Sequence, residues 1–435
     1  MKRAEEMPTV AVSPTKPPSS KPTNICDQLK MVSGPVYIAV MLFAMSTWIG
    51  VVGIWVEMPL LVNALPESWS LPSYLVIIIQ CANLGPATYA IWDKLRQRNQ
   101  QTTNEQQIQQ QHSWIDAEVV VSLVIILTAI VSMLMLSLFW DHTTVVAATQ
   151  RSIVLLTLVC FASLSCCTSS VVFLPYMARF PSVYISAYYF GQGLCGLIPG
   201  LLGLAQVAGH EMQCRNKTDV DSNLTVSIIH YSSTRFSVSA FFLLITSLLC
   251  VSAAAFCCLN FVRRCRSEMV VTAATDQRME NVNEVAAERE ATGLLENRET
   301  ASVAVNTAAV AVQQRRFISL FITIGVVSSL WNGVLPATQT YTCLPYGHII
   351  YKLAVCLSWV VSPLATLPNM LAPTSSLPLI TGLGSVASII AAFHLLLAAQ
   401  SPHPILQGSV IGQVIVVSAS FDLILVLYHT VSLFR

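Results

Sequence analysis

Long apolar stretches separated by short polar segments dominate this chain of 435 residues. A helix needs about 20 apolar residues to cross the hydrocarbon core of a bilayer. Ten stretches of roughly this kind predict ten transmembrane helices, and therefore an all-α polytopic membrane protein. The predicted spans are residues 36–62, 72–92, 118–140, 151–176, 182–207, 236–261, 316–336, 349–371, 377–399 and 405–431.

Two longer polar segments indicate how the spans are grouped. Residues 1–35 are rich in Pro, Ser and Lys and are predicted to form a disordered cytoplasmic tail. Residues 262–315 carry mixed charge with few aromatic residues, which indicates a flexible cytoplasmic linker. This linker separates an N-terminal bundle of six predicted helices, 36–261, from a C-terminal bundle of four, 316–435.

A short repeat supports the division into two related halves. The first span contains STWIGV at 46–51, and the first span after the linker contains SLWNGV at 329–334. The tryptophans of the two segments, Trp48 and Trp331, fall in register. Parallel repeats are typical of transporters whose two bundles move about a site near the bilayer midplane. Coincidence between two apolar helices is the alternative explanation.

The composition and the placement of charge agree with a membrane protein. Only 10% of the residues are charged and 54% are hydrophobic, whereas soluble domains carry about 25% charged residues. The net charge of +1 gives no indication of a nucleic-acid partner. Lys and Arg concentrate before the first span, after the second, between the fourth and fifth, and after the sixth. These segments share one side if the helices alternate, and the positive-inside rule makes that side cytoplasmic.

One loop has the features of an external segment. Residues 209–235 contain two N-glycosylation sequons, at Asn216 and Asn223, in a loop that the charge pattern places outside the cell. Cys214 in this loop and Cys343 after the seventh span are candidates for an external disulfide. Most other cysteines lie within apolar spans, where they act as small hydrophobic residues. The sequence contains no C-x-x-C pair of the kind that would indicate a metal site.

Glu57 stands out because a carboxylate is costly within a bilayer. At the helical period it shares one stripe of the first span with Ser46, Gly50 and Gly53, and a stripe with two tryptophans lies roughly opposite. Either a bend at Gly53 brings both stripes to one cavity, or a single stripe is functional. Three interpretations of Glu57 remain open: a structural ion pair near the outer interface, a contact with substrate, or a proton-coupling group.

Neutral polar residues recur on other predicted spans. Gln80 and Asn83 share a face of the second span, and Asn332 and Gln339 share a face of the seventh. A single amide is often only a contact between helices. As a set, amides and tryptophans predict a pathway for a polar, aromatic, weakly charged solute, since indole faces stack on flat rings. The sequence has no catalytic motif and His394 has no metal-ligand spacing, so neither an enzyme nor a cofactor is expected.

Four longer segments resemble the eukaryotic riboflavin transporter family, the solute carriers for vitamin B2. They are GIWVEMPLLVNALPESWSLPSYLVIIIQCANLGP (53–86), CTSSVVFLPYMARFP (167–181), LWNGVLPATQTYTCLPYG (330–347) and SPHPILQG (401–408). The resemblance implies a fold of the equilibrative-nucleoside-transporter or major-facilitator kind. Val52 departs from the Asn that vertebrate members tend to have there, and Cys166 from an acidic residue found in some members. The family usually has eleven helices, whereas ten are predicted here.

This resemblance implies that the protein imports riboflavin across the plasma membrane by alternating access, with the lipid bilayer around it. The expected substrate-binding residues are Trp48, Glu57, Gln80, Asn83, Trp331, Asn332 and Gln339. Two other functions remain open. One is transport of a nucleoside or another vitamin, and the other is a membrane receptor that binds a flavin without transporting it.

Overall fold

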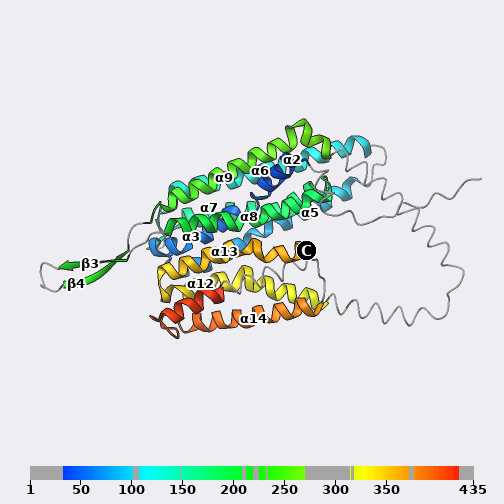
Figure 1. Ribbon diagram of the computed structural model, residues 1–435. Helices are drawn as coiled ribbons and strands as arrows, with labels where there is room; N and C mark the ends of the chain where they lie inside the picture. Colours follow the sequence, from blue (N-terminus) through cyan, green and yellow to red (C-terminus); the bar gives the residue numbers. More distant parts are fainter. Residues whose placement is uncertain are drawn as a thin grey trace, which may run out of the picture.

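The computed structural model describes residues 33–100, 107–146, 148–207, 212–218, 225–231, 234–269, 314, 318–371 and 377–420. Almost all of the predicted tail and most of the predicted linker lie outside these residues. The described part is an all-α bundle with two small β-hairpins, and α13 lies between the helices of the first half and the pair α12 and α14 (Figure 1).

The elements follow the order of the predicted spans. The first half comprises α2 (Gly34–Ala44), α3 (Ile49–Ala64), η1 (Ser68–Ser70), α4 (Leu71–Ala82), α5 (Leu84–Gln100), α6 (Gln107–Phe139), β1 (Thr144–Val146), β2 (Thr149–Arg151), α7 (Ile153–Met177), α8 (Ser182–Val207), β3 (Met212–Thr218), β4 (Thr225–Tyr231) and α9 (Val238–Phe261). The second half comprises η2 (Leu330–Val334), α12 (Leu335–Cys343), η3 (Leu344–Tyr346), α13 (His348–Leu371) and α14 (Leu377–Ala399). Residues 318–329 and 410–420 are also helical.

Most predicted spans coincide with helices that can cross a membrane. Within the described residues, 7 helices are long and apolar enough to do so, and the bent pair α2–α3 raises this number to 8. The other two predicted spans meet shorter apolar helices, His348–Val361 and Val410–Ser420. The last predicted span, 405–431, is described only to residue 420. The fold is therefore that of an all-α polytopic membrane protein.

The first predicted span is broken. Instead of one helix over 36–62, α2 and α3 meet at an angle of 51°. The break falls before Ile49 and not at Gly53, the position considered for a bend. Its carbonyls are partly satisfied by side chains, because Ser46 Oγ donates to the Phe43 carbonyl and Thr47 Oγ1 to the Ala44 carbonyl, each at 2.7 Å.

The small-residue stripe of α3 packs against other helices of the first half. A Cβ atom at Gly53 would lie 3.2 Å from Ile245 of α9, and one at Gly50 would lie 3.4 Å from Met133 of α6. Small residues allow membrane helices to approach closely, and van der Waals packing then supplies the attraction. The stripe is therefore a packing surface and does not face a cavity.

Both β-hairpins lie at the same end of the bundle. The β1–β2 hairpin follows α6, the β3–β4 hairpin precedes α9, and Trp140 Nε1 donates to Ser239 Oγ at 3.0 Å where these two helices meet. The predicted external loop 209–235 thus contains an antiparallel hairpin, with Asn216 opposite Ser227. Asn223 lies outside the described residues, and glycosylation stays a prediction. We call this end of the bundle the hairpin end.

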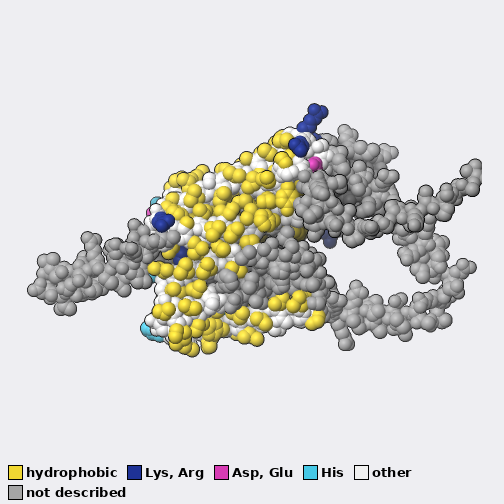
Figure 2. Space-filling view, in the orientation of Figure 1, with side chains coloured by type: hydrophobic (Ala, Val, Ile, Leu, Met, Phe, Trp, Pro, Cys, Tyr) yellow, Lys and Arg dark blue, Asp and Glu magenta, His cyan; other side chains and the backbone are white. Residues whose placement is uncertain are grey.

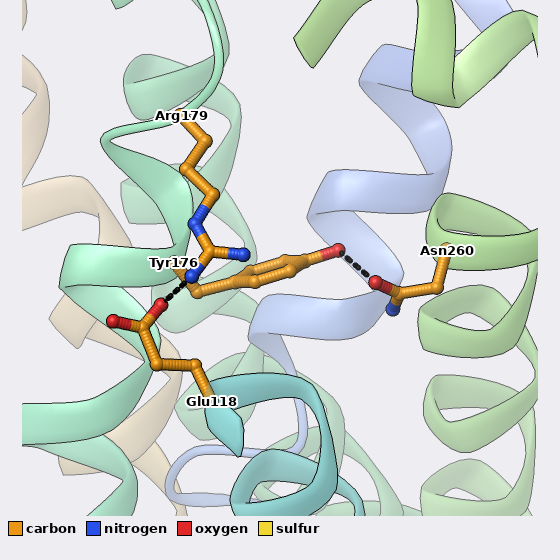
Figure 3. A network of polar contacts seen from close by, with 4 residues as sticks. All are labelled: Glu118, Tyr176, Arg179 and Asn260. Atoms are coloured by element: carbon orange, nitrogen blue, oxygen red, sulfur yellow. Dashed lines mark hydrogen bonds and ion pairs between the residues drawn. The ribbon is translucent and has the colours of Figure 1, made fainter. Parts of the chain in front are cut away.

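A polar network joins three helices at the opposite end (Figure 3). Arg179, in the short turn between α7 and α8, forms an ion pair with Glu118 of α6 and lies 5.6 Å from the centre of the Tyr176 ring. Tyr176 Oη donates to Asn260 Oδ1 of α9 at 3.2 Å. The predicted tight turn between the fourth and fifth spans is confirmed, since α7 ends at Met177 and α8 begins at Ser182.

A second buried glutamate fixes the start of α7. The carboxylate of Glu67 accepts hydrogen bonds from the backbone N–H of Ser152 at 2.7 Å and from Ser152 Oγ at 2.8 Å. Ser152 is the residue immediately before α7, so Glu67 satisfies a donor at a helix N-terminus, where negative charge is also stabilised by the helix dipole. The sequence pattern did not single out Glu67.

Cys343 does not lie in an external loop as predicted. It is the last residue of α12, has no exposed surface, belongs to the main hydrophobic core and is a free thiol. The structure therefore lacks the predicted disulfide between Cys343 and Cys214. The physical reason is that the seventh span continues further than expected, through η3 to Tyr346, and keeps Cys343 within the bundle.

Large hydrophobic side chains cover the outside of the bundle. Figure 2 shows them along the visible face, with Lys and Arg side chains near the ends. On α9, Leu243, Val251 and Phe261 are 54%, 46% and 82% exposed. An apolar surface of this extent is unusual in soluble monomers and is expected of helices that face lipid.

Candidate functional site

A cavity of about 700 Å³ lies between the two halves of the protein. The first half contributes residues of α3, α4, α7 and α8 to its walls, and the second half contributes η2, α12, α13 and α14. The halves pack closely between α8 and α13, where a Cβ atom at Gly200 would lie 2.9 Å from the carbonyl oxygen of Cys356. The glycine-rich α8 thus lets α13 pack against the first half.

Six of the seven residues expected to bind substrate line this cavity. They are Trp48, Gln80, Asn83, Trp331, Asn332 and Gln339. Glu57, the seventh, is not among the lining residues, because its side chain is fully buried elsewhere. The residues come from both halves, so the site exists only where the halves meet.

The tryptophan stripe of α3 forms part of the first half's wall. Trp48, Val52 and Trp55 all line the cavity. The opposite stripe carries the glycines that pack on α6 and α9. Of the two stripes that the sequence left as alternatives, the tryptophan stripe is therefore the one that faces the cavity.

The amides of the two halves form a hydrogen-bonded chain across the cavity. Asn83 Nδ2 donates to Gln80 Oε1 at 3.0 Å, and Gln80 Nε2 donates to the main-chain carbonyl of Asn332 at 2.8 Å. Asn332 Nδ2 donates to the Ser328 carbonyl at 3.1 Å. The helical face shared by Gln80 and Asn83 in the sequence thus meets the corresponding polar face of the second half.

The Asn332 carbonyl lies in a π-helical turn, and the residue four positions later, Pro336, has no N–H with which to occupy it. In η2 the backbone N–H of Leu335 bonds to the carbonyl of Leu330, five residues earlier. Such turns interrupt α-helices frequently at functional sites. The repeat segments 46–51 and 329–334 therefore both fall on helix interruptions, one at the α2–α3 break and one at η2. Interrupted helices at matching positions of two halves are a mark of binding sites in transporters.

Several lining residues were not among the seven expected to bind substrate. Trp359 of α13 meets Trp331 edge to face, with ring centres 5.8 Å apart and an angle of 70° between the planes. His394 of α14 and Tyr189 and Gln192 of α8 also line the cavity. An aromatic or polar side chain in an apolar span was the available signal, but it is shared by many residues that only pack between helices.

Glu57 forms a buried ion pair with Lys352. Glu57 Oε2 lies 3.4 Å from Lys352 Nζ, and their side chains are 0% and 2% exposed. The ammonium group lies 5.7 Å from the centre of the Phe241 ring, and Gln206 lies beside the carboxylate. Of the three interpretations of Glu57, the structure agrees with the structural ion pair. The partner, Lys352, was not singled out in the sequence.

The ion pair links the halves on the hairpin side of the cavity. Along α3, Glu57 follows the cavity residue Trp55, and along α13 Lys352 precedes the cavity residue Val355. At the same end Asn63 Nδ2 and His348 Nδ1 lie 2.9 Å apart. The two helices are therefore joined between the cavity and the hairpin end.

Comparisons with known proteins agree with the site. Residues 33–433 match the family model described as solute carrier family 52, riboflavin transporter. The chain is 33% identical over 407 residues to riboflavin transporter member 3-A of that family from Danio rerio, covering 88% of this chain and 84% of the relative. It is 30% identical over 425 residues to member 3 from Homo sapiens, with 88% and 85% covered. For member 2 from Sus scrofa the identity is 33% over 392 residues, with 88% and 82% covered.

Proposed function

Because this chain belongs to solute carrier family 52, the riboflavin transporter family, we propose that it carries riboflavin across the plasma membrane by alternating access. The observation that carries the proposal is the cavity between the halves, with tryptophans and amides on its walls. Alternating access requires a site that both halves share, and this cavity meets that requirement.

The chemistry of the walls suits a flat, neutral, polar molecule. Trp48, Trp55, Trp331 and Trp359 offer indole faces for the tricyclic ring of a flavin. The amides offer donors and acceptors for ring carbonyls, ring nitrogens and the hydroxyls of the ribityl chain. Among the described lining residues no side chain is acidic or carries Lys or Arg charge, and a volume near 700 Å³ is typical of small-molecule sites, which span about 300–1,000 Å³.

We further propose that the hairpin end faces the outside of the cell. The positive-inside pattern of Lys and Arg and the two sequons in the 209–235 loop support this orientation. The N-terminus and the 262–315 segment are then cytoplasmic. In this orientation the Glu57–Lys352 pair lies on the external side of the cavity.

Uptake of labelled riboflavin by cells that express the full chain tests the proposal, with surface protein quantified on the same cells. We expect saturable uptake that unlabelled riboflavin blocks and that nucleosides leave unchanged. Stronger competition by a nucleoside would favour a nucleoside carrier. Specific flavin binding without uptake, at normal surface levels, would favour a receptor.

Replacing Trp48 by Ala should weaken uptake without a matching loss of surface protein. Trp48 lines the cavity and is only partly buried, so its removal takes away a stacking face for the substrate. We expect the KM for riboflavin to rise about tenfold, the effect of losing one aromatic stacking contact. Trp92→Ala is the matched control, because Trp92 is exposed and lies outside the cavity. Equal losses of uptake and surface protein for Trp48→Ala would give Trp48 a purely structural role.

A further inference from the structure

Contacts between the two halves close the cavity toward the hairpin end. They are the ion pair of Glu57 with Lys352 at 3.4 Å, the contact of Asn63 Nδ2 with His348 Nδ1 at 2.9 Å, the hydrogen bond from Ser73 Oγ to the Ala337 carbonyl at 3.2 Å, and the edge-to-face pair of Trp69 and Tyr341 with ring centres 5.7 Å apart. Lining residues toward the opposite end are exposed, namely Gln80, Asn83 and Asn332. The structure is therefore closed at the hairpin end, and the cavity opens toward the other end.

The Glu57–Lys352 ion pair differs from the neighbouring contacts because it holds two opposite charges away from water. Within the described residues, both carboxylate oxygens of Glu57 and the Nζ atom of Lys352 are buried and make no hydrogen bond. The distance between Glu57 Oε2 and Lys352 Nζ, 3.4 Å, is longer than the roughly 2.7–2.9 Å of a charge-assisted hydrogen bond. The pair thus has electrostatic attraction, but it lacks the hydrogen bonds that accompany a stable buried ion pair.

These features decide whether the pair favours the closed or the open hairpin end. Taking two charges out of water costs more free energy than their attraction returns, unless the geometry is close and further hydrogen bonds satisfy both groups. Neither condition holds for Glu57 and Lys352. The closed arrangement therefore carries an uncompensated desolvation cost, which is recovered when water reaches the two side chains.

The pair lies where an opening of the hairpin end would admit water. Glu57 belongs to α3 of the first half and Lys352 to α13 of the second, so separation of the halves at this end exposes both charges. Lys352 Cε also lies 3.5 Å from where a Cβ atom at Gly203 of α8 would be, so three helices meet at the pair. An uncharged pair would act in the reverse direction, because the hydrophobic effect opposes the exposure of apolar surface.

We propose that hydration of Glu57 and Lys352 drives the hairpin end open, so that the ion pair lowers the free-energy cost of each opening of the cavity at this end. This inference rests on the proposed alternating access and adds the device that makes the closed state reversible. It also accounts for two charges at a position where an apolar contact would hold the closed state more firmly.

The test uses the double variant Glu57→Gln/Lys352→Met in the full chain, expressed in cells. Thr338→Cys adds a thiol on the cavity wall, and a membrane-impermeant maleimide added outside the cells reaches it only when the hairpin end opens. The labelling rate is compared with and without the double variant, and the chain without Thr338→Cys gives the background from the native cysteines. Initial uptake of labelled riboflavin at low concentration, per surface molecule, is the second measurement.

The matched control is the double variant Glu118→Gln/Arg179→Met. Glu118 and Arg179 form an ion pair at the opposite end of the bundle, between α6 and the turn that joins α7 to α8. This pair lies within the first half, so its removal takes away one charge of each sign without changing a contact between the halves. We expect both rates to stay near the wild-type values in this control.

Glu57→Gln/Lys352→Met should reach the surface at about the wild-type level. We expect its labelling rate and its uptake per surface molecule both to fall about tenfold, because uncharged side chains of similar volume often stabilise the packed arrangement relative to a buried ion pair. Uptake and labelling should fall together, since both require the hairpin end to open.

Three results would overturn the inference while leaving the proposed function intact. One is labelling and uptake that are unchanged or faster in Glu57→Gln/Lys352→Met, because faster rates would make the pair a latch that holds the end closed. Another is a double variant as scarce at the surface as the single variants, and the third is an equal fall in the control. Absence of riboflavin uptake by the wild type at normal surface levels would instead overturn the proposed function, while the labelling rates would still report on the ion pair.

Discussion

Neutralising either member of the Glu57–Lys352 pair should remove most of the folded protein from the cell surface. In Glu57→Gln the ammonium group of Lys352 remains buried, 2% exposed, without its counter-ion. Breaking a buried ion pair by removing one partner typically costs about 3–5 kcal/mol, because an uncompensated charge stays in a medium of low dielectric constant. Lys352→Met leaves the carboxylate in the same position. We expect both variants to lose thermal stability in detergent. Uptake should fall in proportion to the loss of surface protein.

The double variant separates the cost of an unpaired charge from other effects. Glu57→Gln combined with Lys352→Met removes both charges and leaves side chains of similar volume, an exchange that is often neutral or stabilising. We expect it to recover most of the surface protein lost by the single variants. Glu67→Gln is the matched control, since Glu67 is also buried but is held by hydrogen bonds from Ser152 and has no cationic partner among those bonds. Single variants as stable as the wild type, or a double variant worse than both, would contradict this account.

Replacing Gly191 by Ala should strongly destabilise the first half. A Cβ atom there would lie 2.3 Å from the carbonyl oxygen of Met41 and 2.8 Å from the Cβ of Ala44. Backbone atoms cannot rotate away as the end of a side chain can, so α2 and α8 must separate. Overpacking of this kind costs about 1–3 kcal/mol or more. We expect a clear fall in melting temperature in detergent.

The same substitution at Gly325 provides the control. Gly325 lies in the helical residues 318–329, and a Cβ atom there would meet no other group within 4 Å. Gly325→Ala should therefore leave stability unchanged or raise it, by up to about 1 kcal/mol for a helix interior. Equal melting temperatures for Gly191→Ala and Gly325→Ala would show that α2 and α8 do not pack as closely as described.

Hydropathy was sufficient to predict most of the described apolar helices and their order, because each helix that crosses a bilayer must carry its own apolar length. It could not predict the break between α2 and α3, because no proline marks the interruption. At the break, the hydroxyl groups of Ser46 and Thr47 donate hydrogen bonds to the carbonyls of the residues three positions earlier. The β3–β4 hairpin was also missed. Its second strand, TVSIIHY, is rich in β-branched residues, and this was the signal available in the sequence.

The residues that line the cavity were easier to single out from the sequence than the contacts between the two halves. Amides in apolar spans must find polar neighbours, so Gln80, Asn83 and Asn332 could be singled out from the sequence alone. Glu57 was singled out for the same reason, but its partner Lys352 belongs to the other half of the chain, and no local spacing relates the two. Contacts between the halves depend on how the bundles dock, which the hydrophobic period of a single helix does not encode.

The π-helical turn η2 changes which mutations can alter the polar cavity. The group that receives the Gln80 amide is the main-chain carbonyl of Asn332, and every amino acid carries a main-chain carbonyl. Alanine at position 332 would therefore keep this acceptor and would report on the Asn332 side chain alone, whereas alanine at position 80 would remove the donor. Deleting Gly333 or Val334 of η2 would place Ala337, which has an N–H, four residues after Asn332 in place of Pro336, and the carbonyl would then return to an ordinary α-helical turn. In a genetic screen, single-residue deletions at these positions are thus expected to be harmful where substitutions are tolerated.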